Sequence, residues 1–200
     1  MSDHDHDVDR FDRWSSHYDR SILQPLLFAP VQAATLSEAQ REIHDVRTVL
    51  DVGCGTGQLL RRAAERFPGA ELFGVDPASG MVGKAQGAPA EVVHARAERL
   101  PFPDAHFDLV TTTLSFHHWE DQQQGLREAR RVLRGEGLFV LTDIVATGWL
   151  RSLLTRRRNE GRFNSPETLD RMLETAGFRP IGRASVPWRP QIKITLARAI

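Results

Sequence analysis

The chain has 200 residues, of which 40% are hydrophobic, so it is long enough for one sizeable core and short for two full domains. Lysine plus arginine equals aspartate plus glutamate at 26 each, and this balance gives no positive field that would draw the protein to nucleic acid or to an anionic membrane. No apolar stretch approaches the roughly 20 residues that span a bilayer, and the acidic, polar start is unlike a secretory signal, so we expect a soluble, cytoplasmic protein with no membrane partner.

The first 45 residues differ in character from the rest of the chain. They mix aromatic and charged side chains, as in FDRWSSHYDRSILQPLLF. We interpret residues 1–45 as a helical cap segment over the functional site. Residues 46–200 then form the main part of what is a single domain overall.

From residue 46 onward, short apolar runs alternate with helical patterns. Apolar runs predict strands, and residues with helical periodicity predict the helices between them. The predicted strands are 48–52, 71–76, 91–97, 107–114 and 137–145, and the predicted helices are 59–67, a short one around 81–84, and 121–133. Strands that alternate with helices favour a doubly wound, mostly parallel α/β sheet.

The last part of the chain predicts one more helix and a hairpin. Ser165 is typical of a helix N-cap with Pro166 at the first helical position, and Gly177 suits the end of that helix. Residues 179–186 and 191–197 are two further strand candidates, separated by a proline-containing turn. They predict a terminal antiparallel hairpin and bring the sheet to seven strands.

The strongest chemical signal is the sequence DVGCGTG, Asp51 to Gly57, between a buried strand and a helix. Glycines let the backbone approach a ligand closely, and the start of the helix offers unpaired N–H groups. Glycines alone also fit an ordinary tight turn. Asp76, however, ends the next strand about 20 residues further on, where a carboxylate in an open α/β sheet accepts both hydroxyls of a ribose. Together the two features favour a nucleoside-type cofactor.

The spacing of the glycines distinguishes between cofactors. Nicotinamide and flavin sites use a glycine at the sixth position of the motif, where this chain has Gln58. The segments VLDVGCGTGQ, GVDPASGM, AERLPFPDAHFDLV, LSFHHWED and EARRVLRGEGLFVLTD instead resemble, in the same order, the class I S-adenosylmethionine-dependent methyltransferases. The resemblance is to the broad group of small enzymes similar to those of ubiquinone and menaquinone biosynthesis, and it implies a Rossmann-like fold.

The resemblance also implies a cofactor, S-adenosylmethionine (SAM), and a product, S-adenosylhomocysteine (SAH). The glycines would pack beneath the methionine and ribose, Asp51 would hold the ammonium group, and Asp76 would bind the ribose hydroxyls. Tyr18 would approach the carboxylate of the cofactor, and the backbone of Thr113 would face its methionine portion. The implied cofactor residues are Tyr18, Asp51, Gly53, Gly55, Gly57, Asp76, Pro77, Met81, Ala97, Glu98 and Thr113.

Around adenine the chain departs from the family pattern. The resemblance places Pro77 and Met81 beside the ring, with an ordinary core role as the alternative for Met81, and it gives the backbone N–H of Ala97 to adenine. The family usually has an acid just before this alanine, whereas this chain has Arg96. Glu98 would replace that acid, or Arg96 would stack on the ring, or Arg96 is simply solvated.

Methyl transfer itself asks little of side chains, because the sulfonium of SAM supplies the leaving group and alignment supplies much of the rate. We expect no metal, since the sequence shows no convincing ligand cluster. A base helps if the acceptor is a hydroxyl or an acidic carbon. His117 and Asp143, which follow or end strands at the expected ligand edge, are the candidates, with a structural role as the alternative for each.

The sequence therefore predicts methyl transfer from SAM to a small-molecule acceptor at O, N or C. A nucleic-acid methyltransferase is the enzymatic alternative, against which the balanced charge argues. A non-catalytic, SAM-binding regulatory protein is the second alternative. The segments that choose an acceptor carry no transferable code, so the sequence predicts the reaction and not the acceptor.

Overall fold

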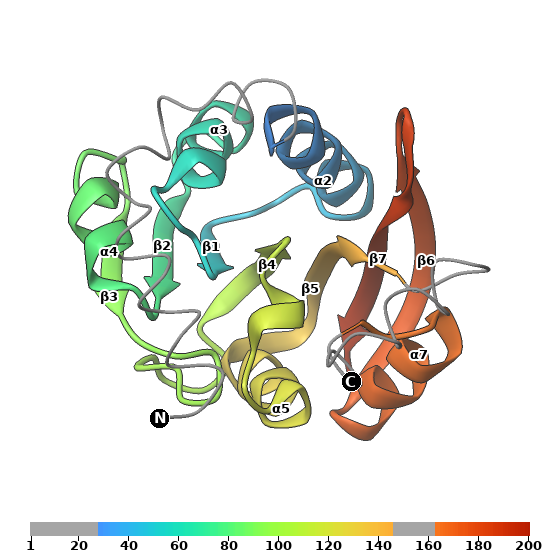
Figure 1. Cartoon of the computed structure of the whole chain (residues 1–200). Helices are drawn as coiled ribbons and strands as arrows, with labels where there is room; N and C mark the ends of the chain where they lie inside the picture. Colours follow the sequence, from blue (N-terminus) through green and yellow to red (C-terminus); the bar gives the residue numbers. More distant parts are fainter. Residues whose placement is uncertain (1–27, 146–162) are drawn as a thin grey trace.

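The computed structural model describes residues 28–145 and 163–200, and its centre is a seven-stranded sheet (Figure 1). In sheet order the strands are β3 (Glu91–His94), β2 (Glu71–Asp76), β1 (Thr48–Val52), β4 (Phe107–Thr113), β5 (Leu133–Ile144), β7 (Arg189–Ala199) and β6 (Phe178–Val186). The pairs from β3 to β5 are parallel, and β7 runs antiparallel to both β5 and β6. The predicted doubly wound, mostly parallel sheet with a terminal antiparallel hairpin is confirmed.

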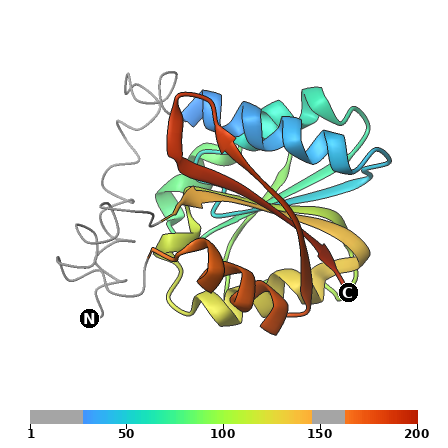
Figure 2. The same cartoon turned by 90° about the vertical axis from the view of Figure 1, so that its right-hand side faces the viewer.

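Helices cover both faces of the sheet (Figure 2). One face carries α2 (Ala29–Glu42) and α3 (Gln58–Arg66), whose buried residues join one core cluster with β1 and β5. The other face carries α5 (Gln122–Val132) and α7 (Pro166–Thr175), which pack into a second cluster. None of the helices in the described ranges is long and apolar enough to cross a membrane.

Helix α2 lies within the segment predicted as a helical cap. It is helical, and it packs on the sheet beside α3, where Leu36 and Ala39 are buried. The hydroxyl of Thr35 lies 2.8 Å from the hydroxyl of Thr142 in β5, so the contact between helix and sheet is partly polar. This part of the segment covers the sheet, residues 1–27 lie outside the described ranges, and the division at residue 45 stays a prediction.

The predicted element boundaries differ most from the structure at two strands, β3 and β5. Strand β3 ends at His94, three residues before the predicted end. Beyond it, Ala97 packs into the core cluster to which α5 also contributes. Strand β5 begins at Leu133, immediately after α5, although Gly135 and Gly137 weaken its strand pattern. Pairing of Leu133 with Phe107 of β4 overrides that weak local preference.

The helix and hairpin at the end of the chain follow the prediction. Ser165 caps α7 by accepting from the N–H of Thr168, Pro166 is its first residue, and Gly177 has a φ of +89° just beyond it. In the hairpin, Val186 pairs with Arg189, so the connecting turn is two residues long and β7 starts earlier than predicted.

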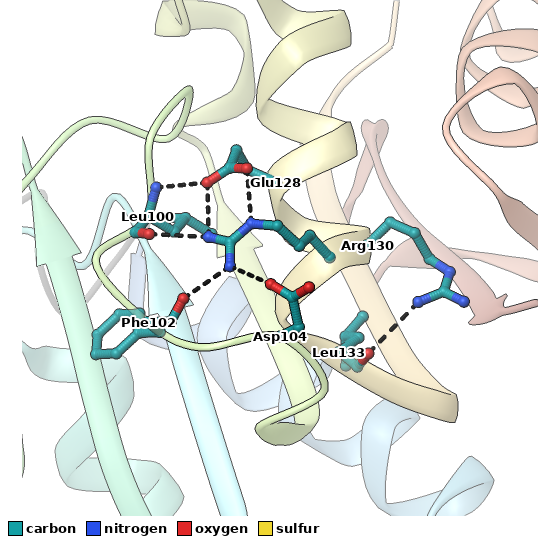
Figure 3. A network of polar contacts seen from close by, with 7 residues as sticks. Leu100, Phe102, Asp104, Glu128, Arg130 and Leu133 are labelled. Atoms are coloured by element: carbon teal, nitrogen blue, oxygen red, sulfur yellow. Dashed lines mark hydrogen bonds and ion pairs between the residues drawn. The ribbon is translucent and has the colours of Figure 1, made fainter.

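The loop after β3 is fixed to α5 by one arginine. Arg131 donates to the carbonyl oxygens of Leu100 and Phe102 at 2.9 and 2.8 Å, and it pairs with Asp104 and Glu128 at 2.8 Å (Figure 3). The hydrogen bond from Arg131 is the largest of the effects that hold the pKa of Glu128 below its ordinary value. The network therefore fixes the loop after β3 against α5 at Leu100, Phe102 and Asp104.

Candidate functional site

The order of strands places a ligand site between β1 and β4. The chain runs from β1 outward to β3 on one side and then returns to β4 on the other. In open α/β sheets, ligands bind at the carboxyl ends of the strands where the order reverses in this way. The glycine turn follows β1 at this edge, and the segment after β4 faces it.

The glycine turn has backbone angles that residues other than glycine rarely adopt. Gly53, Gly55 and Gly57 have φ of +77°, +55° and +77°. The N–H groups of Gly53 and Cys54 donate to the carbonyl of Val75 at 2.8 and 3.0 Å, so the turn is tied to the end of β2. A Cβ on Gly53 would lie 1.9 Å from the hydroxyl oxygen of Ser115, whereas one on Gly55 would meet nothing within 4 Å. The turn is thus packed on one side and open on another.

Asp76, at the end of β2, holds the glycine turn. Its Oδ2 accepts from the N–H of Gly55 at 2.8 Å and its Oδ1 from the N–H of Ala78 at 2.9 Å. These two bonds hold the carboxylate in one orientation. Asp76 is 8% exposed, so the group is pre-oriented in a largely dry position.

Asp51 lies deeper than Asp76, at 2% exposure beneath the turn. Its Oδ1 accepts from the Thr111 hydroxyl of neighbouring β4 at 2.9 Å. Burial raises the pKa of Asp51 to about 7, the Thr111 hydrogen bond opposes this, and the charge of Asp76 adds to it. A cation that reached Asp51 would therefore relieve a buried, costly negative charge.

We expect Asp51→Asn to stabilise the free protein at pH 8. The folded-state pKa lies above the unfolded value of 3.8, so the native state binds the proton more tightly and the free energy of unfolding falls as pH rises from about 4 to about 7. The asparagine variant does not undergo this decrease in the free energy of unfolding, which is at most about 4 kcal/mol in the wild type. Denaturant unfolding at pH 5 and pH 8 measures the difference.

Asp108→Asn is the matched control for this measurement. Hydrogen bonds from Arg47, Arg134 and Thr48 outweigh burial and hold the pKa of Asp108 below its ordinary value. The sign therefore reverses, because that carboxylate adds stability above its unfolded pKa. Asp108→Asn should destabilise the protein at pH 8. Destabilisation of both variants alike at pH 8 would contradict the raised pKa of Asp51.

A pocket opens beside Asp76 at this edge of the sheet. It is lined by Val52, Gly53, Val75, Pro77, Ala95, Arg96, Ala97, Glu98, Ser115, His118, Trp119 and Glu120. Four of the predicted cofactor residues therefore share one pocket: Gly53, Pro77, Ala97 and Glu98.

Two other predicted residues, Met81 and Thr113, do not line this pocket. Met81 is 3% exposed on α4 (Ser79–Ala85) and does not line the pocket, which fits the alternative of core packing. Thr113 ends β4, and its hydroxyl is buried without a hydrogen-bond partner among the described residues. Tyr18 lies outside the described ranges.

Arg96 lies at the pocket in an ion pair. Its Nη1 is 2.8 Å from Oε2 of Glu120, and both side chains are about half exposed. Oε1 of Glu98 accepts from the N–H groups of Glu120 and Asp121 at 2.8 and 3.2 Å. The loops after β3 and β4 are therefore joined directly at the pocket.

His117 and Asp143, predicted as separate candidates, form a pair. The distance from Nδ1 of His117 to Oδ1 of Asp143 is 2.7 Å, and Oδ2 accepts from the backbone N–H of His117 at 3.0 Å. Their side chains are 14% and 4% exposed. Phe163 stacks on the His117 ring with centroids 4.9 Å apart, so the imidazole is fixed from two directions.

The pocket also contains residues that the sequence did not indicate, among them Ser115, Trp119 and Glu120. All three flank the short helix η2 (Phe116–His118), directly after β4. Their position after a parallel strand at the ligand edge was the available signal. That position identifies the segment but not which of its side chains face the pocket.

The chain is similar in sequence to known methyltransferases. A methyltransferase-domain family model matches residues 50–141. The demethylmenaquinone methyltransferase of Deinococcus radiodurans is 34% identical over 177 residues, which cover 73% of each chain. The malonyl-[acyl-carrier protein] O-methyltransferase of Geobacter sulfurreducens is 35% identical over 150 residues, which are 66% of this chain and 56% of that protein.

A solved structure supports the fold independently. It is the complex between the Haloferax volcanii Trm112 methyltransferase activator and a putative methyltransferase, matched with a TM-score of 0.78 at 19% identity, over 94% of this chain and 97% of that one. Fold, family match and relatives together show that the chain belongs to the class I SAM-dependent methyltransferases.

Proposed function

We propose that this protein transfers the methyl group of SAM to an oxygen or an acidic carbon of a small organic acceptor, and that His117 removes the acceptor's proton. The observation that carries the proposal is the 2.7 Å contact between His117 and Asp143 at the carboxyl ends of β4 and β5. An acceptor that is already nucleophilic needs no such base.

The pair has the features of an oriented general base. In neutral His117 the proton lies on Nδ1 and is donated to Asp143, so Nε2 is the basic nitrogen. When Nε2 takes a proton, the largely buried Asp143 carboxylate stabilises the imidazolium. Bound SAM would supply an electrophilic methyl group on a sulfonium that leaves as neutral SAH.

The residues of the glycine turn fit this cofactor. The space around Gly55 gives room for a ligand. A carboxylate at the end of the second strand, such as Asp76, is the group that binds a ribose diol in open α/β sheets. Asp51 would hold the ammonium of the methionine portion, whose positive charge offsets the cost of a buried carboxylate. The hydroxyl of Thr113, which has no hydrogen-bond partner within residues 28–145 and 163–200, adds a polar group at the same edge.

Two observations support a small acceptor. The net charge of zero gives no general attraction to nucleic acid. The relative of Deinococcus radiodurans is named for demethylmenaquinone, which is a small organic molecule.

A screen tests the proposal. The purified protein is incubated with fractionated metabolites of a cell extract and SAM labelled in its methyl group, and labelled products are identified by mass spectrometry. We expect a labelled small molecule with a new methyl group on oxygen or carbon. SAH binding without labelling of any fraction would favour a cofactor-binding regulator, and labelling of nucleic acid alone would favour the enzymatic alternative.

A further inference from the structure

The pocket beside Asp76 has apolar walls and one charged rim. Val75, Ala97 and Trp119 are each at most 7% exposed and form walls suited to a flat aromatic ring. The charged groups that line the same pocket are Arg96, Glu98 and Glu120. A ring that enters between such walls would present its polar edge to these groups.

The three charged residues make different contacts. Oε1 of Glu98 accepts from two backbone N–H groups at the start of the segment before α5, which fixes the backbone of Glu120. Arg96 has donors only, and its Nη1 engages Oε2 of Glu120 at 2.8 Å. Oε1 of Glu120 keeps its acceptor capacity, so this rim can accept a hydrogen bond although its loop carries an arginine.

From this arrangement we propose that Glu120 accepts a hydrogen bond from the exocyclic amino group of adenine, and that Arg96 is the positioning residue that holds Glu120 for it. The inference rests on the proposed function, because it requires SAM and SAH in this pocket. It makes Glu120 a specificity-determining residue, since a carboxylate favours an amino group over the carbonyl oxygen of hypoxanthine.

Binding of the product and of its hypoxanthine analogue, S-inosylhomocysteine, tests this without any acceptor. By calorimetry we expect the wild type to prefer SAH. Glu120→Ala should lose about tenfold in affinity for SAH and little for the analogue, because a charge-assisted hydrogen bond is removed for one ligand only. Glu120→Gln should recover part of the preference, since its amide oxygen still accepts.

The role of Arg96 is tested by a double-mutant cycle. Arg96→Ala should weaken SAH binding a few-fold in the wild type and have no effect in the Glu120→Ala background. Glu136→Ala, which removes the exposed carboxylate of a different ion pair, is the control and should change neither affinity. Equal losses for both ligands, or an unchanged ratio of affinities in Glu120→Ala, would overturn the inference alone. Failure of the wild type to bind SAH at all would overturn the proposed function as well.

Discussion

Replacing His117 with asparagine should lower kcat by about 10²- to 10⁴-fold, the usual contribution of a general base, while the Kd for SAH stays unchanged. An asparagine amide still donates to Asp143 and so keeps the local contact, but it has no basic nitrogen. Initial rates with the acceptor found by the screen give kcat, and calorimetry gives the Kd for SAH.

Two further variants separate catalysis from structure at this pair. The double variant His117→Asn with Asp143→Asn should be about as slow as His117→Asn alone, because Asp143 acts through the imidazole. His44→Asn, a substitution of an exposed histidine, should leave kcat unchanged. If His117→Asn kept more than about half of the wild-type kcat, the acceptor would not need a base and an amine would become the better candidate.

Replacing Asp76 with alanine should weaken SAH binding by about 2 kcal/mol, roughly 30-fold. The carboxylate would accept two ribose hydroxyls, and it already fixes the glycine turn through Gly55 and Ala78. Both effects favour binding, one by direct contact and one by ordering the free site, so the loss should exceed that of Asp76→Asn, which keeps one acceptor oxygen. Calorimetry gives the affinities, and circular dichroism with thermal unfolding checks the fold.

Asp45→Ala is the control for this substitution, because Asp45 is an exposed carboxylate on the loop before β1. It should leave the Kd unchanged. Normal SAH affinity in a folded Asp76→Ala variant would mean that the ribose lies elsewhere, and the pocket beside Asp76 would lose its assignment.

Local sequence patterns predicted most of the fold. Apolar runs entering glycine or polar turns located every strand, and the cap at Ser165 and the stop at Gly177 located α7. Boundaries were wrong where tertiary pairing overrides local preference. Strand β5 starts at Leu133 through a glycine-rich stretch because Phe107 of β4 supplies its partner.

The candidate site was predicted less completely, because side-chain pairs depend on packing between distant segments. His117 and Asp143 are 26 residues apart, and each was chosen only for its place at a strand end. Arg96 was recognised as unusual, but its partner Glu120 follows a different strand. Spacing along the chain shows which segments meet at the edge of the sheet and does not show which side chains pair there.

A calorimetric titration of the wild-type protein with SAM, SAH and NAD tests the central claim most directly. The carboxylates at the ends of β1 and β2, and Gln58 where dinucleotide sites have glycine, predict that both adenosyl ligands bind and that NAD binds more weakly. Tighter binding of NAD than of either adenosyl ligand would contradict the account.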